Sequence, residues 1–385
     1  MKGHIDRFNS TIAGWAFDPN YPGRAVEIVI EHNGHPIYRC TADFCRIDLL
    51  DAVGEENHGF SFDPTEEDGF TRNMHLSVFA VTDKKHLLHE GLWMYEGAVA
   101  FGEDEWLFLN TDSNQVNLRI SAQVDIEAEK IHRTALLFAM REATLKQLGI
   151  PYRSLILPEK NVVCSQFLPG LAVSEMRPVN LIMEQLSRLN CTAIYPIDEF
   201  RGNASILFSK TDTHANASGY RLIFEIIRSE LPELFGDVKL PSPVLNTKFC
   251  GDLGGKIRPV RIETVEEYAH PASAEHYYKH DNVLETIASG GRLRGQTIYV
   301  VNEHAKNRLL VFGTSSAYHA LPLLSCGFAQ TLMIWENTFD YRVIELFKPD
   351  CILWLPAERF LPTDLNDVSG LPATFQQVSK LMTEL

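Results

Sequence analysis

Short apolar runs that alternate with polar residues fill the first 95 positions and predict β-strands. Residues 25–31 alternate with period two, and another apolar run returns at 36–40. Asn33 and Gly34 lie between them and supply the pair of positive φ angles that a two-residue hairpin turn requires. Further apolar runs follow at 59–62 and 76–81. Several short strands separated by turn residues predict a small β-sandwich.

From about residue 97 the pattern changes to helical spacing interrupted by short apolar runs. A long helix is predicted over 121–148, where Gly149 and then Pro151 end it. Strands are predicted at 153–157, 191–195, 204–208, 308–312, 331–335 and 351–355. Helices are predicted at 176–189, 217–231, 318–326 and 341–347, with a loop-rich stretch over 235–295. Apolar strands that feed into helices predict an α/β fold with a mostly parallel sheet, covered by helices on both faces.

Length and charge agree with two globular domains that do not bind nucleic acid. At roughly 150 residues per domain, 385 residues predict two domains or three, each large enough to bury a core. The change of pattern at 95–97 divides the chain into a β-sandwich module, 1–96, and an α/β domain, 97–385. Lys and Arg number 35 against 50 Asp and Glu, which gives a net charge of -15. A chain this negative repels phosphate backbones, so nucleic acid is not an expected partner.

The cysteines and the first residues bear on cellular location. The seven cysteines include no Cys-x-x-Cys pair and no zinc-site spacing, so we expect free thiols in a reducing compartment. No apolar run is long enough to cross a membrane. The first twenty residues lack the apolar segment of a signal peptide, so the sequence as written predicts a cytoplasmic protein. A periplasmic or cell-envelope location is the alternative if an export signal has been removed.

The first candidate catalytic residues lie at the end of the strand predicted over 308–312. Gly313 ends the strand, Ser315 follows two positions later, and a helix begins at once. In open α/β sheets such a turn places a hydroxyl beside the unpaired N–H groups of a helix N-terminus, where a developing oxyanion is stabilised. The alternative is that Thr314 or Ser315 only caps the helix.

A second candidate segment, 208–220, also precedes a predicted helix. It places Asp212 and His214 two residues apart. A serine nucleophile needs a base within hydrogen-bonding reach and a third group that fixes the tautomer of that base. Asp212 and His214 can supply both from one turn. The alternative is a helix start in which Asp212, Asn216 or Ser218 is the cap.

These segments and several others resemble one known family. The shared features are Gly-Thr-Ser at 313–315, Lys-x-Asp-Thr-His-x-Asn-x-x-Gly at 210–219, Trp106 to Leu109 with Asp112 and Asn114, and the segments 157–160, 251–254, 348–350 and 358–361. Together they span about residues 98–362. In this order they resemble the alginate O-acetyltransferase family, a branch of the SGNH (GDSL-like) hydrolase superfamily. The Asp-His pair precedes the Ser, which is the permuted order of that family.

The resemblance implies a role for each matched residue. Ser315 corresponds to the nucleophile, His214 to its general base and Asp212 to the residue that orients His214. The backbone N–H of Ser315 would contribute to the oxyanion hole. Asn337, Glu358 and Arg359 follow the next strands and are candidate substrate or oxyanion ligands. Ordinary loop polar groups or an ion pair are the alternative for these three residues.

The implied activity is transfer of an acetyl group to a carbohydrate hydroxyl in bacterial polysaccharide biosynthesis. A carbohydrate acetylesterase and a non-catalytic polysaccharide-binding protein are the alternatives. Thr314 in place of a commoner Asp, and Ala215 where the family has an aromatic residue, keep the last alternative open. No tightly bound cofactor or metal is expected, and acetyl-CoA or a partner acyl carrier would supply the acetyl group. A polysaccharide and its assembly proteins are the expected partners, and an acidic glycan would need Lys210 and Arg359 in the crevice.

The first 96 residues carry a resemblance of their own. Gly14 to Asp18, Val26 to Ile28 with Asn33-Gly34, Ala42-Asp43, Arg46 to Leu49 and His58 to Phe60 resemble an accessory module of bacterial glycosyltransferases and surface-polysaccharide enzymes. Trp15, Trp93 and Tyr95 are candidates for a sugar-stacking platform, although aromatic residues in a small sandwich are more often core. Four further histidines, His270, His276, His280 and His319, are expected to be surface or hydrogen-bonded residues and not metal ligands.

Overall fold

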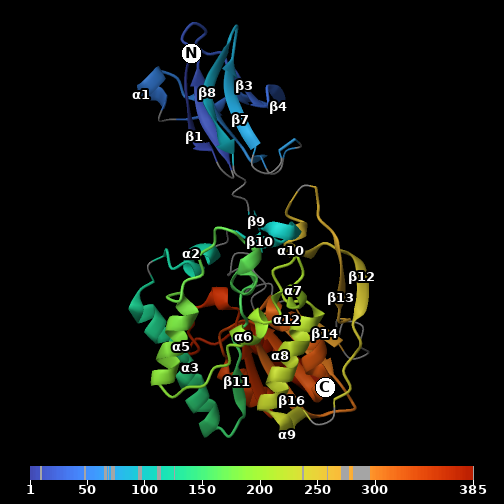
Figure 1. The fold of residues 1–385 in the computed structure, drawn as a ribbon. Coiled ribbons are helices and arrows are strands. Elements are labelled where there is room, and N and C mark those ends of the chain that lie inside the picture. Colours follow the sequence, from blue (N-terminus) through green and yellow to red (C-terminus); the bar gives the residue numbers. More distant parts are fainter. Residues whose placement is uncertain are drawn as a thin grey trace. The chain divides into compact units, whose positions relative to one another are not determined.

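The chain forms two compact units (Figure 1). The computed structural model describes residues 1–385 except 9, 10, 47, 48, 65, 66, 68, 71–73, 94–97, 111–113, 125, 236, 237, 258, 270–276, 281–294 and 385. The first unit comprises Met1–Ala100 and Gly255–Arg261, and the second comprises Phe101–Gly254 and Ile262–Leu385. The boundary that the sequence predicts, near 95–97, lies outside the described residues, and the assignment of 255–261 to the first unit has no counterpart in the predicted pattern.

The first unit contains two four-stranded antiparallel sheets. One has the order β1 (Lys2–Phe8), β2 (Ile12–Phe17), β6 (Asn57–Phe62), β5 (Phe44–Cys45), and the other β4 (His35–Ala42), β3 (Val26–His32), β7 (Met74–Val81), β8 (Lys85–Trp93). A short helix, α1 (Leu50–Val53), precedes β6. Asn33 and Gly34 both have positive φ, 50° and 77°, so the predicted hairpin turn is present. Alternate residues of both sheets, among them Ile12, Ile28 and Leu76, form one hydrophobic cluster.

A six-stranded mixed sheet forms the centre of the second unit. Its order is β11 (Tyr152–Ser154), β18 (Cys351–Leu355), β16 (Lys306–Gly313), β17 (Phe328–Trp335), β15 (Thr297–Val301), β14 (Tyr277–His280). The first four strands are parallel, whereas β15 and β14 join antiparallel. The sheet is therefore mixed, with three parallel pairings out of five. Every residue of β18 is buried, as expected for a parallel strand covered on both faces.

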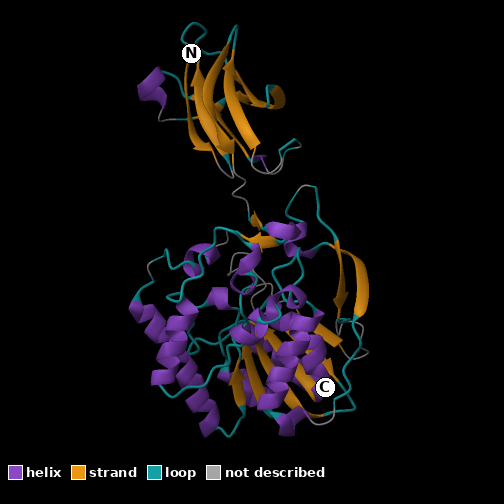
Figure 2. Ribbon diagram, viewed as in Figure 1, coloured by secondary structure: helices purple, strands orange, loops and turns teal. Residues whose placement is uncertain are grey.

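Helices flank this sheet (Figure 2). The described helices of the second unit are α2 (Val116–Ile120), α3 (Ala128–Gln147), α4 (Lys160–Val163), α5 (Pro178–Arg188), α6 (Ile197–Arg201), α7 (Ala204–Leu207), α8 (Ala217–Glu230), α9 (Pro232–Phe235), α10 (Gly251–Gly254), α12 (Ser315–Leu324), α13 (Tyr341–Phe347) and α14 (Pro372–Glu384). Apolar residues of α3, α5, α13 and α14 share one buried cluster with Leu310, Phe312 and Trp354 of the sheet. Two small antiparallel pairs complete the unit: β9 (Val99–Phe101) with β10 (Leu107–Leu109), and β12 (Val244–Phe249) with β13 (Glu263–Glu267).

Three predicted elements differ from the structure. The strand predicted at 204–208 is the helix α7, in which Ala204 and Leu207 are buried one turn apart while the residues between them are exposed. The strand predicted at 191–195 makes a single parallel bridge, at Ile194, before Pro196 interrupts it. The long helix begins at Ala128 and not at 121, because Ala122 has a φ of 55° and ends the short helix before it.

Candidate active site

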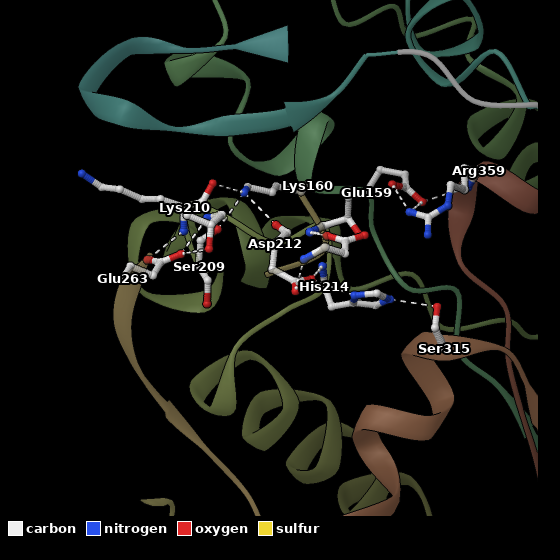
Figure 3. A network of polar contacts seen from close by, with 12 residues as sticks. Glu159, Lys160, Ser209, Lys210, Asp212, His214, Glu263, Ser315 and Arg359 are labelled. Carbon is white, nitrogen blue, oxygen red and sulfur yellow. Dashed lines mark hydrogen bonds and ion pairs between the residues drawn. The ribbon is translucent and has the colours of Figure 1, made fainter. Parts of the chain in front are cut away.

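Two loops that follow apolar segments of the second unit bring together Asp212, His214 and Ser315. The first loop, 209–214, leads into α8, and the second connects β16 to α12. Nδ1 of His214 lies 2.7 Å from Oδ1 of Asp212, and Nε2 of the same ring lies 2.8 Å from Oγ of Ser315 (Figure 3). The three side chains thus form one hydrogen-bonded chain from carboxylate to hydroxyl. With Nδ1 donating to the carboxylate, Nε2 accepts the Ser315 hydroxyl proton.

The backbone around Ser315 leaves its hydroxyl available for this contact. Thr314 precedes α12 but makes no side-chain capping hydrogen bond, so the interpretation of Thr314 as a cap is wrong. Its Oγ1 is buried and has no hydrogen-bond partner within the described residues. Gly313 is required sterically, because a Cβ there would lie 2.5 Å from Cβ of Ala317 and 3.0 Å from the carbonyl oxygen of Leu355. The helix therefore begins directly at Ser315, whose N–H belongs to the first turn that α-helices leave unpaired.

At the other loop, Asn216 is the helix cap and Asp212 is not. Oδ1 of Asn216 accepts the backbone N–H of Gly219, which opens α8. Asp212 uses Oδ1 for both the ring and the backbone N–H of His214, each at 2.7 Å, and Oδ2 for the backbone N–H of Asp252 at 3.0 Å. These hydrogen bonds let the carboxylate of Asp212 orient the imidazole.

Hydrogen bonds from outside the loop fix the backbone of 209–214. Lys160 donates to the carbonyl oxygens of Ser209, Lys210 and Asp212 at 2.7, 3.0 and 2.7 Å. Backbone N–H groups are bound by two carboxylates: Glu263 accepts those of Lys210 and Thr211, and Asp252 accepts that of Thr213. The carbonyl of Thr211 accepts the N–H groups of Leu253 and Gly254. The loop is held by several separate chain segments, so the Asp-His pair is preorganised.

Electrostatics keep Asp212 ionised. Burial alone raises the pKa of its carboxyl, but the hydrogen bonds and charge of His214 and the N–H of Asp252 outweigh burial and lower the pKa well below its ordinary value. The carboxylate is therefore present as the negative partner that an imidazolium needs during proton transfer.

The remaining predicted site residues lie in other contacts. Oδ1 of Asn337 accepts the indole N–H of Trp354 at 3.0 Å, so this amide supports the core. Glu358 is 6% exposed and pairs with Arg177 at 3.2 Å, which agrees with the ion-pair alternative and not with a position in an open crevice. Arg359 pairs with Glu159 at 3.1 Å.

Lys210 does not face the nucleophile. Its ammonium donates to the backbone oxygen of Asp104, and Figure 3 shows the side chain directed away from Ser315. The cation that the sequence assigned to the crevice is therefore bound elsewhere, whereas Arg359 lines a small pocket together with His214 and Ser316.

A pocket of about 70 Å³ lies beside the imidazole. His214 and His319 line it together with residues in or next to the paired strands β12 and β13, namely Phe249, Val265, Glu266, Glu267 and Tyr268. The rings of His214 and His319 lie 4.6 Å apart. The spacing of four residues between Ser315 and His319 on one helix is the sequence signal that places His319 on the same face. Lys160 and Asp252 lie in the segments 157–160 and 251–254 that resemble the family, but the sequence assigns neither a role, and Glu263 has no local signal.

The described residues include one carboxylate and histidine cluster with metal-ligand spacing, Asp212, His214 and Asp252. Both oxygens of Asp252 already accept from Thr213, its backbone N–H and its hydroxyl, at 2.7 Å. The ligand atoms of Asp212 and His214 bind one another. The arrangement is that of a hydrogen-bonded loop. Of the predicted histidines, His270 and His276 lie outside the described residues, and His280 ends a strand.

The aromatic platform predicted in the first unit is only partly described. Trp93 is 1% exposed and packs on Phe70 with ring centroids 5.6 Å apart, so it is a core residue. Trp15 is half-buried in β2. Tyr95, like Asp112 of the second unit, lies outside the described residues. All seven cysteines are free thiols.

Comparisons with known proteins give structural matches. No protein-family model matches the sequence, and no curated protein matches it. Among solved structures, Bacillus cereus PatB1 matches with a TM-score of 0.51 and 17% identity, over 69% of this chain and 97% of that chain. PatB1 with a sulfonyl adduct gives a TM-score of 0.50 over 69% and 95% of the two chains, also at 17% identity. The O-acetyltransferase domain of Pseudomonas putida AlgJ, 17% identical, gives a TM-score of 0.47 over 74% and 99%.

Over 69% of its length, the chain has the fold of PatB1. At the level of the fold, the resemblance to the alginate O-acetyltransferase family that the sequence predicts is confirmed. Among the described residues, none of the helices is both long enough and apolar enough to cross a membrane.

Proposed function

We propose that the second unit is an acyltransferase that forms an acetyl-Ser315 intermediate and passes the acetyl group to a carbohydrate hydroxyl. The observation that carries the proposal is the continuous hydrogen-bonded chain from Asp212 through His214 to Ser315, with contacts of 2.7 and 2.8 Å. A nucleophilic serine needs a base in direct contact and a carboxylate that fixes the base, and these contacts meet both requirements. The permuted order of the three residues and the fold of PatB1 support the same assignment.

The first half-reaction loads the enzyme. His214 Nε2 takes the proton of the Ser315 hydroxyl while Oγ bonds to the acetyl carbonyl carbon of the donor. The carbonyl oxygen becomes negative and is stabilised by N–H groups in the first turn of α12. The bond between the carbonyl carbon and the donor's leaving atom then breaks, and His214 returns the proton to the leaving group.

The second half-reaction is the reverse with a sugar hydroxyl in place of the donor. His214 removes the hydroxyl proton, the sugar oxygen attacks the acetyl carbon, and Ser315 leaves and recovers its proton from His214. Water in place of the sugar gives hydrolysis, so an acetylesterase shares every residue of this mechanism. The acceptor alone separates the two activities.

A chromogenic acetyl ester tests the nucleophile. Wild type is expected to release acetyl with Ser315 labelled in intact-mass and peptide analysis, while Ser315→Ala releases none above the uncatalysed rate. A neighbouring control, Ser316→Ala, removes a hydroxyl that makes no hydrogen bond to His214 in the described structure and is expected to leave the acetylated peptide at Ser315. Equal release by wild type and Ser315→Ala refutes the nucleophile, and retention of the protein on polysaccharide without turnover would favour a binding protein.

Partition of the acetyl group then separates transferase from esterase. With neutral and acidic oligosaccharides added to the acetyl-enzyme, mass spectrometry measures acetyl on sugar against free acetate. A transferase yields acetylated sugar that increases with oligosaccharide concentration, whereas an esterase yields acetate at a rate that does not respond to the sugar.

A further inference from the structure

One lysine in the second unit is buried against the triad without touching the reacting atoms. Lys160 is 1% exposed and begins α4, in a segment separated from Asp212 by some fifty positions. A buried lysine is rare unless its charge is compensated. Its ammonium also lies 5.1 and 5.3 Å from the ring centroids of Trp106 and Phe108, which are favourable positions for a cation.

Its hydrogen bonds account for the burial. The ammonium has three N–H donors, and three backbone carbonyls accept them, those of Ser209, Lys210 and Asp212, at 2.7, 3.0 and 2.7 Å. These carbonyls surround the turn from which Asp212 extends toward His214, as Figure 3 shows. A neutral amine has two N–H groups, so one of the three hydrogen bonds that hold the turn would be lost.

We infer that Lys160 is a positioning residue of the triad, whose protonated ammonium binds the carbonyls of the 209–212 turn and thereby holds Asp212 against His214. This inference rests on the proposed acyl transfer only where it predicts how Lys160 affects the reaction rate. The contact between Asp212 and His214 is a structural consequence that can be measured without turnover. Misplacing such a group by about 1 Å costs on the order of 100-fold in rate.

The charge of Lys160 adds a dependence on pH. Burial lowers the pKa of its ammonium to about 8, and the nearby anionic groups oppose this only in part. Wild-type activity is therefore expected to fall above about pH 8 as the third hydrogen bond is lost. The carboxylates that face Lys160 are those of Asp212, Asp252 and Glu263, and each favours the charged form; the thiol of Cys164, whose pKa burial raises to about 12, also faces it and is neutral near pH 8.

The first test replaces Lys160 and follows both rate and structure. Lys160→Met is expected to lower kcat about 100-fold with little change in KM, and Lys160→Arg, which stays charged at all assay pH values, is expected to remove the alkaline fall. In proton NMR, a low-field signal of the His214 Nδ1 proton, assigned by its absence in His214→Ala, is expected in wild type and lost in Lys160→Met. Asp340→Ala, which removes a buried cap of α13, is the destabilised control and keeps the signal.

A double variant shows whether Lys160 acts through Asp212. If it does, adding Lys160→Met to Asp212→Asn costs less than about threefold more. Three results would each overturn the inference. The losses in rate of the two single variants multiply in the double variant, the low-field signal is unchanged in folded Lys160→Met, or Lys160→Arg keeps the fall in activity above about pH 8. If Lys160→Met does not fold, the pH profiles of wild type and Lys160→Arg still test whether the charge of Lys160 is needed for activity. If only the proposed acyl transfer is wrong, the result differs: the low-field signal of His214 is still lost in Lys160→Met, but Ser315 is never acetylated.

Discussion

Replacement of Asp212 by Asn tests the triad most directly, because it keeps the shape and removes the charge. Oδ1 of Asp212 accepts two N–H groups of His214, and Oδ2 accepts the N–H of Asp252. An amide has one acceptor oxygen, so its NH₂ group must face a donor in either orientation. If the NH₂ group faces Asp252, the tautomer of His214 is kept but the negative charge is lost. If the NH₂ group faces His214, it imposes the tautomer in which Nε2 cannot accept the Ser315 proton.

The two orientations bracket the expected loss. A hydrogen bond to a charged group is worth about 1.5 to 3 kcal/mol, and losing about 3 kcal/mol of transition-state stabilisation lowers the rate by about 100-fold. The wrong tautomer costs about 10⁴-fold where it has been measured in a serine protease. We therefore expect kcat/KM of Asp212→Asn to fall by about 10² to 10⁴.

The assay is release of acetyl from the chromogenic ester at neutral pH, with thermal unfolding to verify the fold. Asp252→Asn is the matched control, since it alters a carboxylate of the same cluster that has no contact with the imidazole. The hydroxyl of Thr213, which now donates to Asp252, can reverse and accept from the new amide, so a loss below about tenfold is expected. A loss below tenfold in Asp212→Asn, or an equal loss in both variants, would refute the orienting role.

Acid stability gives an independent measurement on the same variant. Burial raises the pKa of Asp212, but His214 and Asp252 together hold it below the ordinary value of 3.8. The ionised carboxylate therefore stabilises the fold fully above about pH 4, and this contribution is lost as the pH falls further. Asp212→Asn is expected to flatten the fall in unfolding free energy over that range, measured by urea titrations at several pH values.

Three further predictions concern the surroundings of the triad. Gly251→Ala is expected to lower the unfolding free energy by more than about 2 kcal/mol in denaturant titrations, because its φ is +63° and a Cβ would lie 2.2 Å from the Thr211 carbonyl oxygen; a neutral result would show that the loop can shift. Glu358→Gln removes the buried carboxylate that pairs with Arg177 and leaves it only the exposed Glu175 at 3.9 Å, so it should cost about 3 kcal/mol, part of which Arg177→Met restores in the double variant. Burial raises the pKa of Cys164 to about 12, so mass spectrometry should find it alkylated by iodoacetamide only in the unfolded protein.

The residues of the triad could be predicted because each has a local signal. Gly313 and Ser315 stand where an apolar strand turns into a helix, and Asp212 and His214 stand together before another helix start. Such signals depend on neighbours in the chain, and the structure brings these residues within hydrogen-bonding distance. Their catalytic roles stay predictions until the variants are measured.

The partners of these residues could not be predicted, because their contacts join distant segments. In a sequence, a lysine such as Lys160 predicts an exposed side chain, and only its three carbonyl partners explain its burial. Glu358 and Arg359 follow β18, where the sequence favours crevice residues, but Arg177 and Glu159 from other loops pair with them. The segment 204–208 shows the same limit, since its four-residue helix is set by packing and not by propensity.

The loop at 209–214 combines charges of both signs, and this combination explains how it stays fixed. Carboxylates of Glu263 and Asp252 bind its N–H groups, while the ammonium of Lys160 binds its carbonyls. Each charge meets the backbone dipole of opposite sign, so hydrogen bonding compensates the desolvation of all three groups. These groups come from β13, α10 and α4. The position of the base is therefore a property of the folded second unit and not of its own turn, which is why we expect substitutions in those three elements to change the rate without touching His214.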